Sequence, residues 1–378
     1  MNLLFVAYDF PPVIGGQSNY YFNLLENITK ANVTILAPYI QGSELIDREI
    51  KGRIYRTRWL TLNSSLWKII RTLPLLVLVF QVVRQEKIRL IHCGQLLSIG
   101  IIGYLFKKIL GIPYWVYLHG SEIRIETKLS PVEIIGRIIL QNANKIVVSS
   151  KFTCKKYVKL GIRREKMIIV TPGINMDKFR AETNTDWVRK RYSVYDKKII
   201  LTVARLFEHK GVDMVIKALP EVLARVPNTI YFIVGKGPEK ERLKKMVIKN
   251  NLEENVLFIG YVPAKDLPAY YEACDVFIMV SREIREKSHV EGFGIVCLEA
   301  NACGKPVIGG RTGGVEEAIC DGETGLLIEP YRKEDVVQAL IRLLIDKKYS
   351  QRLGNNGRER VKQNFTWKER AEIIERLL

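Results

Sequence analysis

The sequence of 378 residues has no uninterrupted apolar run of the roughly 18 residues that a membrane-spanning helix needs. Its six cysteines form no C-x-x-C pair, so they resemble the small buried hydrophobic residues of a reducing compartment and do not support a metal site. The opening stretch, MNLLFVAYDFPP, has neither a basic leader nor a long apolar run, and we expect a buried strand there instead of a signal peptide. These absences favour a cytoplasmic location.

Several recognisable motifs are missing too. The sequence has no full G-x-G-x-x-G fingerprint with an acidic residue about twenty positions later, which argues against an NAD-binding protein. The basic residues are not interleaved with aromatic residues as in nucleic-acid-binding modules. Carboxylates with a D-x-D-like spacing at a strand end are also absent. We therefore expect no nucleic acid as a partner, no metal and no other cofactor.

Positive charge is abundant and unevenly distributed. Of the net charge of +19, the first 180 residues carry +15 and the remaining residues +4. A basic half beside a nearly balanced half indicates an anionic partner on the first half. Because nucleic acid is disfavoured, we expect that partner to be an anionic membrane surface.

Two stretches of the first half could meet such a surface. The segment at 66–89, LWKIIRTLPLLVLVFQVVRQEKIR, has an apolar core with basic residues on both sides. It is interpreted either as a helix packed on a sheet, which Pro74 starts or kinks, or as an interfacial segment on anionic lipid, and one helix can be both. A second basic stretch lies at 150–166. We expect peripheral attachment to the inner face of the cell membrane.

Short apolar segments alternate with helical stretches along the whole chain, which is typical of parallel sheets with helices on both faces. The length favours two α/β domains over one. Their boundary is expected at 171–182, where Pro172 and Gly173 end a strand. The predicted strands are Leu3–Tyr8, Val33–Ala37, Ile54–Arg58, Leu90–His92, Tyr114–Leu118, Ile146–Ser149 and Ile168–Val170, then Lys198–Val203, Ile230–Val234, Val256–Ile259, Val276–Met279, Pro306–Gly309 and Gly325–Ile328.

The most informative stretch is EGFGIVCLEANACGKPVIGGRTGG, residues 291–314. Glu291 is expected in a loop after a strand, where a ligand can reach it. Glycines 292 and 294 let the backbone approach that ligand closely. The helix that begins near Ile295 points its free N–H groups at the same place, which favours a phosphate.

Three charged residues suit the same ligand. Glu299, just over one turn into that helix, is placed to bind a ribose diol as a carboxylate. Arg205 and Lys210, in LTVARLFEHKGVD, follow the first strand of the second half, and two cations at the carboxyl end of a strand suit a diphosphate. The alternative for all three is a solvated surface side chain. Together they fit a nucleotide diphosphate-sugar.

Other candidates are weaker by themselves. The pair Gly15-Gly16 lies between the first strand and the first helix, where a glycine pair most often makes a turn. His119, in YWVYLHGSE, ends a strand, where a single histidine is more often a structural hydrogen-bonding group. The expected neighbours of the nucleotide base or ribose, mostly through their backbone, are Gly235, Gly237, Tyr261 and Val262.

The pattern around Glu291 and Glu299 resembles the E-x7-E region of the retaining glycosyltransferases of family 4, which have the two-domain GT-B fold. The stretch SREIREKSHVEGFGIVCLEANACGKPVIGGRTGG is similar in particular to the phosphatidylinositol mannosyltransferases. The resemblance implies two Rossmann-like domains facing a deep cleft. It places the acceptor on residues 1–175, the donor on 176–364, and a helix at 365–378 that returns to the first domain.

The resemblance also implies roles for individual residues. Arg205 and Lys210 match the family's R-x4-K stretch, whose cations hold the donor pyrophosphate. His119 matches a histidine placed against the donor sugar, and Gly16, with Gly15, matches a loop that approaches the donor phosphates. The predicted catalytic residues are His119, Arg205, Lys210 and Glu291; the predicted donor contacts are Gly15, Gly16, Arg205, Lys210, Gly235, Gly237, Tyr261, Val262, Glu291, Gly292, Phe293, Gly294, Ile295 and Glu299.

The expected reaction is the transfer of a hexosyl group from a nucleotide diphosphate-sugar to a lipid-linked or glycan acceptor hydroxyl, with retention of configuration and without a metal. The run before Glu291 favours GDP-mannose, with UDP-glucose and UDP-N-acetylglucosamine as alternatives. A nucleotide-sugar epimerase of the same fold would need inward-facing acid and base carboxylates that the sequence does not reveal. A non-catalytic lipid-binding protein would explain the basic half alone.

Overall fold

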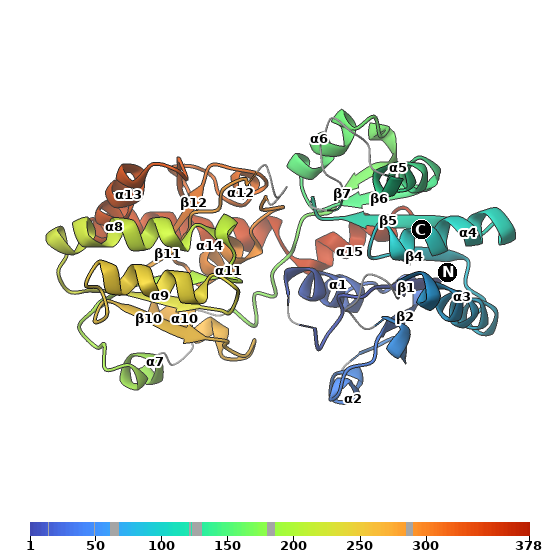
Figure 1. The fold of residues 1–378 in the computed structure, drawn as a ribbon, viewed down its shortest axis with the longest axis horizontal. Helices are drawn as coiled ribbons and strands as arrows, with labels where there is room; N and C mark the ends of the chain where they lie inside the picture. The colour runs from blue at the N-terminus through green and yellow to red at the C-terminus, as the bar shows by residue number, and fades with distance from the viewer. Residues whose placement is uncertain are drawn as a thin grey trace. The chain divides into compact units, whose positions relative to one another are not determined.

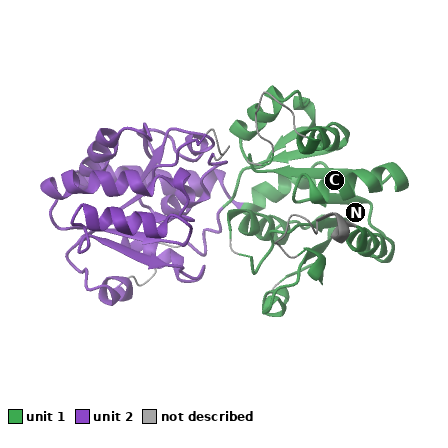
Figure 2. Ribbon diagram, viewed as in Figure 1, with its two compact units in different colours: residues 1–173, 367–378 green, residues 174–366 purple. Residues whose placement is uncertain are grey.

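The computed structural model describes residues 1–13, 15–48, 50–60, 68–120, 122, 131–179, 186–284 and 290–378. These residues form two compact units, residues 1–173 with 367–378 and residues 174–366 (Figure 2). Each unit contains one parallel sheet, with helices in the connections between its strands (Figure 1). We call them unit 1 and unit 2.

Unit 1 is built on a seven-stranded sheet in the order β3-β2-β1-β4-β5-β6-β7. Its elements are β1 (Asn2–Val6), α1 (Gly16–Glu26), β2 (Asn32–Pro38), α2 (Ser43–Asp47), β3 (Arg53–Thr57), α3 (Lys68–Gln85), β4 (Leu90–Cys93), α4 (Ser98–Leu110), β5 (Tyr114–Leu118), α5 (Pro131–Asn142), β6 (Lys145–Val148), α6 (Lys151–Lys159), β7 (Met167–Ile169) and α15 (Trp367–Glu375).

The sheet of unit 1 buries different side chains on its two faces, because successive residues of a strand point to opposite sides. Leu4, Val6 and Ile91 join the aliphatic core that also contains buried residues of α3, α4 and α5. Phe5 lies against the aromatic side chain of Tyr21 in α1, with ring centroids 4.9 Å apart. The second face is therefore an aromatic layer under α1.

Helix α15 belongs to unit 1 although it follows all of unit 2 in the chain. The Trp367 ring packs edge-on against Tyr20 of α1 at 5.5 Å. The Glu375 carboxylate accepts hydrogen bonds from the backbone N–H groups of Thr29 and Lys30, just beyond α1. These contacts attach α15 along α1.

Unit 2 is built on a six-stranded sheet in the order β10-β9-β8-β11-β12-β13. Its elements are α7 (Asp186–Arg191), β8 (Lys198–Val203), α8 (Val212–Arg225), β9 (Thr229–Val234), α9 (Lys240–Lys249), β10 (Val256–Gly260), α10 (Leu267–Ala273), β11 (Val276–Met279), α11 (Ile295–Ala302), β12 (Val307–Gly310), α12 (Val315–Ala318), β13 (Gly325–Ile328), α13 (Lys333–Ile345) and α14 (Lys347–Asn364).

Alternate residues of the central strands fill two separate cores in unit 2. Leu201 and Phe277 lie in a core with residues of α10 and α11, whereas Ile200 and Ile278 lie in a core with residues of α8 and α13. The strands are buried on both faces, which is why they appear in the sequence as continuous apolar runs.

Both sheets confirm the predicted pair of Rossmann-like domains. All thirteen predicted strands are present, and no strand end differs from its predicted position by more than two residues. The short helices α2 and α7 were not predicted. The predicted interfacial segment forms α3 in part, and its residues 66 and 67 lie outside the described residues, as do 180–182 of the predicted boundary.

Candidate functional site

The candidate site of unit 2 lies where the strand order of the sheet reverses. Strands β8 and β11 are neighbours, but the chain connects β8 to β9 on one side and β11 to β12 on the other. The loops after such strands diverge and leave room for a ligand at the carboxyl edge of the sheet. Arg205 and Lys210 follow β8, and Glu291 follows β11, so the structure puts all three on the two loops of this switch point.

Lys210 and Glu291 form an ion pair in which the Lys210 ammonium donates a hydrogen bond to the Glu291 carboxylate. Only 16% of each side chain is exposed. Burial alone would raise the pKa of Glu291, but the Lys210 charge and hydrogen bond, with the His209 ring and the Phe293 backbone N–H, hold that pKa below its ordinary value. Glu291 is therefore a carboxylate with a fixed position at neutral pH.

Gly211 fixes where the backbone of Lys210 can run. It has a φ of +68°, and a Cβ atom at this position would lie 1.8 Å from the Val280 carbonyl oxygen. No other residue type fits between this turn and the end of β11. Helix α8 starts at the next residue, Val212, so the glycine places Lys210 directly before the helix.

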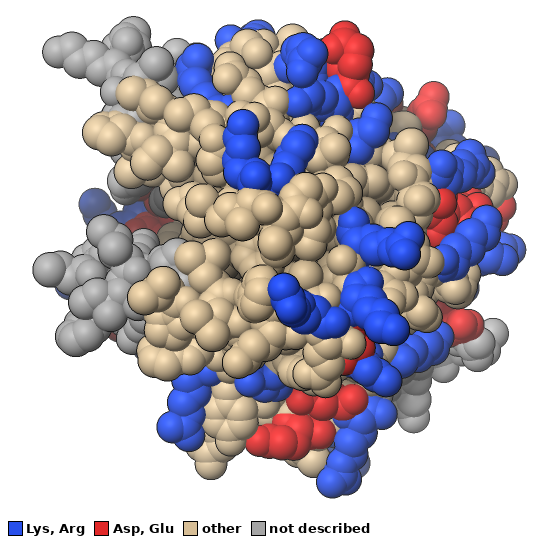
Figure 3. All heavy atoms as spheres, turned by 90° about the vertical axis from the view of Figure 1, so that its right-hand side faces the viewer, with Lys and Arg blue, Asp and Glu red and all other residues tan. Residues whose placement is uncertain are grey.

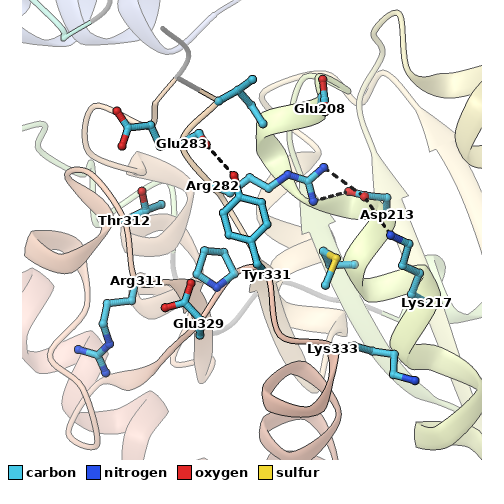
Figure 4. A pocket seen from close by; sticks show the side chains of 13 residues that line it. Glu208, Asp213, Lys217, Arg282, Glu283, Arg311, Thr312, Glu329, Tyr331 and Lys333 are labelled. Atoms are coloured by element: carbon cyan, nitrogen blue, oxygen red, sulfur yellow. Dashed lines mark hydrogen bonds and ion pairs between the residues drawn. The ribbon is translucent and has the colours of Figure 1, made fainter. Parts of the chain in front are cut away.

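A second, buried ion pair holds the same two loops together (Figure 4). The Arg282 guanidinium contacts both oxygens of Asp213 in the first turn of α8, each at 3.1 Å. The Arg282 backbone N–H donates to the His209 carbonyl at 2.8 Å, and the Tyr331 ring lies against the guanidinium. Arg282 is 6% and Asp213 5% exposed. This buried pair, which we call the brace, supports the loop that carries Lys210 on the side of the loop that faces the protein interior.

This brace forms one wall of a hollow of about 940 Å³ at the edge of unit 2. The hollow holds as many carboxylates as cations in the view of Figure 4, and the cations have carboxylate partners: Lys217 pairs with Asp213, and Arg311 with Asp321. The cations of the hollow are therefore already paired with carboxylates that line it or lie beside it.

Arg205 differs from Lys210 in being exposed. Its guanidinium lies over the Phe207 ring at 5.3 Å, and it forms no ion pair with any residue that the structure describes. The stem of its loop is fixed by backbone hydrogen bonds from Ala204 to Val234 and from Leu206 to Lys236. Arg205 is thus a charged group on a rigid base, open to an incoming anion.

Gly235 and Gly237 make this rigid base possible. A Cβ atom on Gly235 would lie 1.9 Å from the Ala204 carbonyl oxygen, and one on Gly237 would lie 2.4 Å from that of Leu206. The two glycines let the loop after β9 pack directly on the loop after β8. The structure gives them this packing role, and their predicted contact with a nucleotide base stays a prediction.

The loop of Glu291 is held by the second glycine pair of the motif. The Gly314 N–H donates to the Glu291 carbonyl at 2.9 Å, and a Cβ atom on Gly314 would lie 1.9 Å from the Gly292 carbonyl oxygen. Gly294 has a φ of +88° and precedes the first residue of α11, Ile295. The predicted arrangement of a carboxylate, a glycine turn and a helix N-terminus is therefore present.

Phe293 and Glu299 point into the protein. The Phe293 ring is buried against Phe365 at 6.0 Å. Glu299 is 7% exposed and accepts a hydrogen bond of 2.6 Å from the Tyr271 hydroxyl. Burial raises the pKa of Glu299, and the Tyr271 hydrogen bond and the Lys178 charge reduce that rise. One of its oxygens thus has a protein partner, which the sequence did not predict.

Tyr261 and Val262 follow β10, next to the loop of Gly235 in the sheet. Tyr261 is half exposed, with the Lys236 ammonium 5.9 Å from its ring centroid, while Val262 is buried. The exposed ring provides a flat apolar surface at the same edge of the sheet as Arg205 and Lys210.

In unit 1 the predicted residues also lie at the carboxyl edge of the sheet. Gly15 and Gly16 start α1, and a Cβ atom on either would meet nothing within 4 Å. His119 follows β5, and its ring lies edge-on to the rings of Tyr20 and Tyr21, one turn further along α1. Unlike Gly235, Gly237 and Gly314 of unit 2, this pair has open space beside it.

Glu122 holds the backbone at His119, a role that the sequence analysis missed. Its carboxylate accepts hydrogen bonds from the N–H groups of His119 at 2.5 Å and Gly120 at 2.9 Å, and from the Tyr157 hydroxyl. The spacing H-G-S-E was the available signal, because a carboxylate three residues after a turn often binds its N–H groups. Asp213 and Arg282 gave no such local signal.

Metal-ligand clusters and membrane-spanning helices are both lacking among the residues that the structure describes. Nowhere among them do three or more His, Cys, Asp or Glu side chains gather as metal ligands would. None of the helices they form is long and apolar enough to cross a membrane. The stretch at 285–289, before Glu291, lies outside the described residues.

Comparisons with known proteins cover nearly the whole chain. The family model described as Glycosyltransferase Family 4 matches residues 14–178, and the model described as Glycosyl transferases group 1 matches residues 184–360. A GDP-mannose-dependent alpha-(1-6)-phosphatidylinositol monomannoside mannosyltransferase of Mycolicibacterium smegmatis is 29% identical over 100% of this chain and 98% of its own length. The protein with the same name from Mycobacterium tuberculosis is 27% identical over 97% of this chain and 95% of its own length.

Solved structures share the fold. Sucrose-phosphate synthase from Thermosynechococcus elongatus superposes with a TM-score of 0.82 and 23% identity, over 100% of this chain and 98% of that one. Anabaena Alr3699/HepE in complex with UDP and glucose gives a TM-score of 0.83 with 19% identity, over 100% and 99% of the two chains. With these matches and the switch-point site, the chain belongs to the family 4 glycosyltransferases of GT-B fold and is a hexosyltransferase that uses a nucleotide-sugar.

Proposed function

We propose that this enzyme transfers a mannosyl group from GDP-mannose to a hydroxyl of a lipid-linked or glycan acceptor at a membrane, with retention of anomeric configuration. The observation that carries the reaction class is the Lys210–Glu291 pair at the switch point of unit 2. GDP-mannose is favoured by the names of the two mycobacterial relatives. UDP-glucose and UDP-N-acetylglucosamine are the competing donors.

Two cations of unit 2 would take the place of a metal ion in compensating the negative charge of the diphosphate. Lys210 is fixed before α8 and Arg205 is exposed on a rigid loop, so both can contact the diphosphate as negative charge develops on it. The N-terminus of α11 adds free N–H groups. With this charge compensated by the protein, the reaction should need no metal and no other cofactor.

Glu291 would orient the sugar through its hydroxyl groups, and Glu299 would contact the ribose with the oxygen that Tyr271 does not bind. In the reaction, the bond between the anomeric carbon and the diphosphate oxygen breaks, and the nucleotide diphosphate leaves with the electron pair. The acceptor oxygen forms its bond on the same face of the sugar. Its proton passes to an oxygen of the leaving diphosphate, so no enzymic nucleophile is required.

From unit 1, His119 would contact the donor sugar, and Gly15 and Gly16 would let the loop before α1 approach the donor phosphates. The open space beside both glycines supports this role, because a backbone without side chains can come within hydrogen-bonding distance of a phosphate.

The proposal is tested by incubating the full-length enzyme with GDP-mannose, UDP-glucose or UDP-N-acetylglucosamine and measuring nucleotide release. Vesicles with and without a phosphatidylinositol mannoside supply the acceptor. We expect the fastest acceptor-dependent release with GDP-mannose, an α-linked product, and full activity in excess EDTA. Faster release with a UDP-sugar would replace the donor, and loss in EDTA with recovery in Mg²⁺ or Mn²⁺ would contradict the metal-free site.

Unit 1 supports the membrane part of the proposal. Helix α3 buries Leu75 and Val79 in the core but exposes Leu73 and Val77, so one helix has both an inner and an outer apolar face. Helix α5 exposes further apolar residues, which the sequence analysis did not single out: Val132, Ile134, Ile135 and Ile138. Apolar side chains beside basic ones favour the surface of an anionic bilayer.

The charges of unit 1 are arranged accordingly. On the face shown in Figure 3, Lys and Arg side chains border broad uncharged areas, with fewer Asp and Glu among them. Part of the second basic stretch is used inside the protein: Lys156 donates to the Gly120 carbonyl and Lys166 to those of Gln141 and Ala143. The exposed cations that remain in this stretch include Lys155 and Lys159. We place the enzyme at the cytoplasmic surface of the membrane.

A further inference from the structure

The ring of His119 has one hydrogen-bonding neighbour among the residues that the structure describes. This neighbour is the Tyr21 hydroxyl, 2.8 Å from Nε2. The same hydroxyl also forms a hydrogen bond with the Gly94 carbonyl oxygen. His119 and Gly94 thus share a single phenolic O–H, and this determines the direction of both hydrogen bonds.

A hydroxyl has one proton, and a carbonyl oxygen can only accept. Tyr21 therefore donates to Gly94, and its oxygen has only lone pairs left for His119. Gly94 is held at the end of β1, because its N–H donates to the Val6 carbonyl at 2.8 Å, and its own carbonyl oxygen accepts from the Tyr21 hydroxyl. His119 Nε2 must consequently carry a hydrogen and donate it to Tyr21.

The surroundings keep this arrangement at neutral pH. Burial, with the carboxylates of Glu122 and Asp9, raises the pKa of Tyr21 well above its ordinary value, so the phenol keeps its proton. Burial also lowers the pKa of His119, although the same two carboxylates oppose that shift. The His119 ring also lies edge-on to the Tyr20 ring. The Lys156 ammonium donates to the carbonyl of the next residue, Gly120.

A neutral imidazole with its hydrogen on Nε2 has a lone pair on Nδ1. We propose that Tyr21 is a positioning residue that fixes His119 in the Nε2–H form, so that Nδ1 accepts a hydrogen bond from a hydroxyl of the donor sugar. The part of this inference that concerns the sugar rests on the proposed function. The part that concerns the proton rests only on the Tyr21–Gly94–His119 geometry.

The position of the proton can be measured without any activity assay. The chain has four histidines, so full-length protein with ¹⁵N-labelled histidine gives long-range ¹H–¹⁵N spectra that His→Gln variants can assign. We expect the His119 pattern of a neutral ring protonated on Nε2. A ring protonated on Nδ1, or a doubly protonated ring at pH 7.5, would overturn the inference.

Two matched variants test the role of Tyr21. Tyr21→Phe removes the acceptor for Nε2–H, and an unpaired buried donor is costly, so a fraction of the Nδ1–H form should appear at His119. Tyr117→Phe is the control, because this hydroxyl lies in the same aromatic layer and bonds to His92 Nδ1 at 3.0 Å. It should change the His92 signals alone. An unchanged His119 pattern in Tyr21→Phe would refute the positioning role.

Kinetics add the link to the donor. Tyr21→Phe should lower kcat/KM for the sugar-nucleotide by about tenfold, the loss expected for one hydrogen bond, and Tyr117→Phe should lower it by less than about twofold. If no donor is turned over by the unaltered enzyme, the proposed function fails, and the nitrogen spectra still decide where the proton is. Equal kinetic losses in both variants would remove the connection between Nδ1 and the sugar.

Discussion

Lys210 and Arg205 occupy different environments although both were predicted to hold the diphosphate. Lys210 is mostly buried and already paired with Glu291, whereas Arg205 is exposed and without an ion-pair partner among the described residues. A diphosphate that reaches Lys210 therefore competes with Glu291 for the ammonium. Arg205 has no such competitor, and it is suited to the first contact with an incoming anion.

Replacing either cation should mainly affect catalysis. Charge-assisted hydrogen bonds contribute roughly 1.5–3 kcal/mol each, and more where charge develops in the transition state. We expect Lys210→Ala and Arg205→Ala each to lower turnover at least about a hundredfold, measured as nucleotide release under saturating donor. Thermal denaturation of each variant reports whether the fold is kept.

The matched control is Lys198→Ala. Lys198 lies at the amino end of β8, whose carboxyl end leads to Arg205, and its ammonium is 3.5 Å from Asp275. Lys198 is thus a cation with a carboxylate partner, like Lys210, but it lies at the opposite end of the strand that leads to the site. Its replacement should leave turnover within a few fold, and near-normal transfer by Lys210→Ala or Arg205→Ala would contradict the assignment.

At the scale of elements, the loops of the site are kept in place by contacts between backbones. The loop after β8 packs on the glycines after β9, and the loop of Glu291 packs on the glycines after β12. Each close approach leaves no room for a Cβ atom. These glycines support the charged residues through packing, and for that role their exact positions matter more than their flexibility.

Gly314→Ala and Gly16→Ala should therefore differ sharply. Neither glycine has a positive φ, but a Cβ atom at Gly314 would lie 1.9 Å from the Gly292 carbonyl oxygen, while one at Gly16 would meet nothing within 4 Å. We expect Gly314→Ala to reduce the free energy of unfolding by roughly 1–3 kcal/mol or more and to displace Glu291. Gly16→Ala should keep the stability and raise KM for the donor. Urea denaturation and donor titration measure the two effects.

Two results would contradict the roles given to Gly314 and Gly16. A Gly314→Ala variant as stable as the unaltered enzyme would mean that the motif's second glycine pair does not hold the Glu291 loop. A Gly16→Ala variant with unchanged donor KM would separate the loop before α1 from the donor phosphates.

The sequence predicted the strands well because the inner strands of both sheets are buried on both faces and are therefore continuous apolar runs. Arg205, Lys210 and Glu291 were singled out by their positions after strands and by the resemblance; the structure puts them on the two loops of the switch point, and their contacts with a donor stay a prediction. The sequence could not predict contacts between positions far apart in the chain, such as the pair formed by Arg282 and Asp213 or the Tyr271 hydrogen bond to Glu299. No local spacing indicates which buried partner a polar side chain will meet.

At the scale of the molecule, unit 1 contains a buried histidine that the sequence analysis did not consider. His92 in β4 is stacked on Trp115 at 4.7 Å, and its Nε2 has no partner among the described residues. Burial lowers the pKa of His92 to about 3. The unfolded chain binds a proton on this ring below about pH 6.5, but the folded unit does not, so stability is lost as the pH falls below that value.

This loss should be measurable as a pH-dependent melting temperature. At pH 5.5 a single histidine of this kind costs about 1.4 kcal/mol, which lowers Tm of a unit this size by roughly 3–6 °C relative to pH 7.5. His92→Gln and His92→Leu should both reduce that difference, because neither side chain binds a proton. Circular dichroism melting curves at both pH values provide the test. If both variants kept the Tm difference of the unaltered protein, the assignment of this difference to His92 would be refuted.

The proposed membrane attachment would depend on unit 1 and not on unit 2. Ile134 and Ile138 are exposed on the same side of α5, and Ile248 is exposed on α9 of unit 2. We expect Ile134→Glu with Ile138→Glu to weaken flotation of the full-length enzyme with anionic vesicles, while Ile248→Glu leaves it unchanged. Added salt should weaken flotation as well, because it screens the attraction of the basic side chains.

Neutral vesicles complete this experiment. Equal binding to neutral and anionic vesicles, or equal loss in the α5 and α9 variants, would contradict attachment through unit 1.

The position of α15 has a consequence for the synthesis of the protein. Tyr20 and Thr29 leave the ribosome early, but their partners Trp367 and Glu375 follow only after the whole of unit 2. When the ribosome has finished unit 2, all residues of the cores of unit 2 have been made, but the side of α1 that α15 will cover is still exposed in unit 1. The unit translated first is the last to be complete, and a chaperone that protects this protein during translation would have to shield α1.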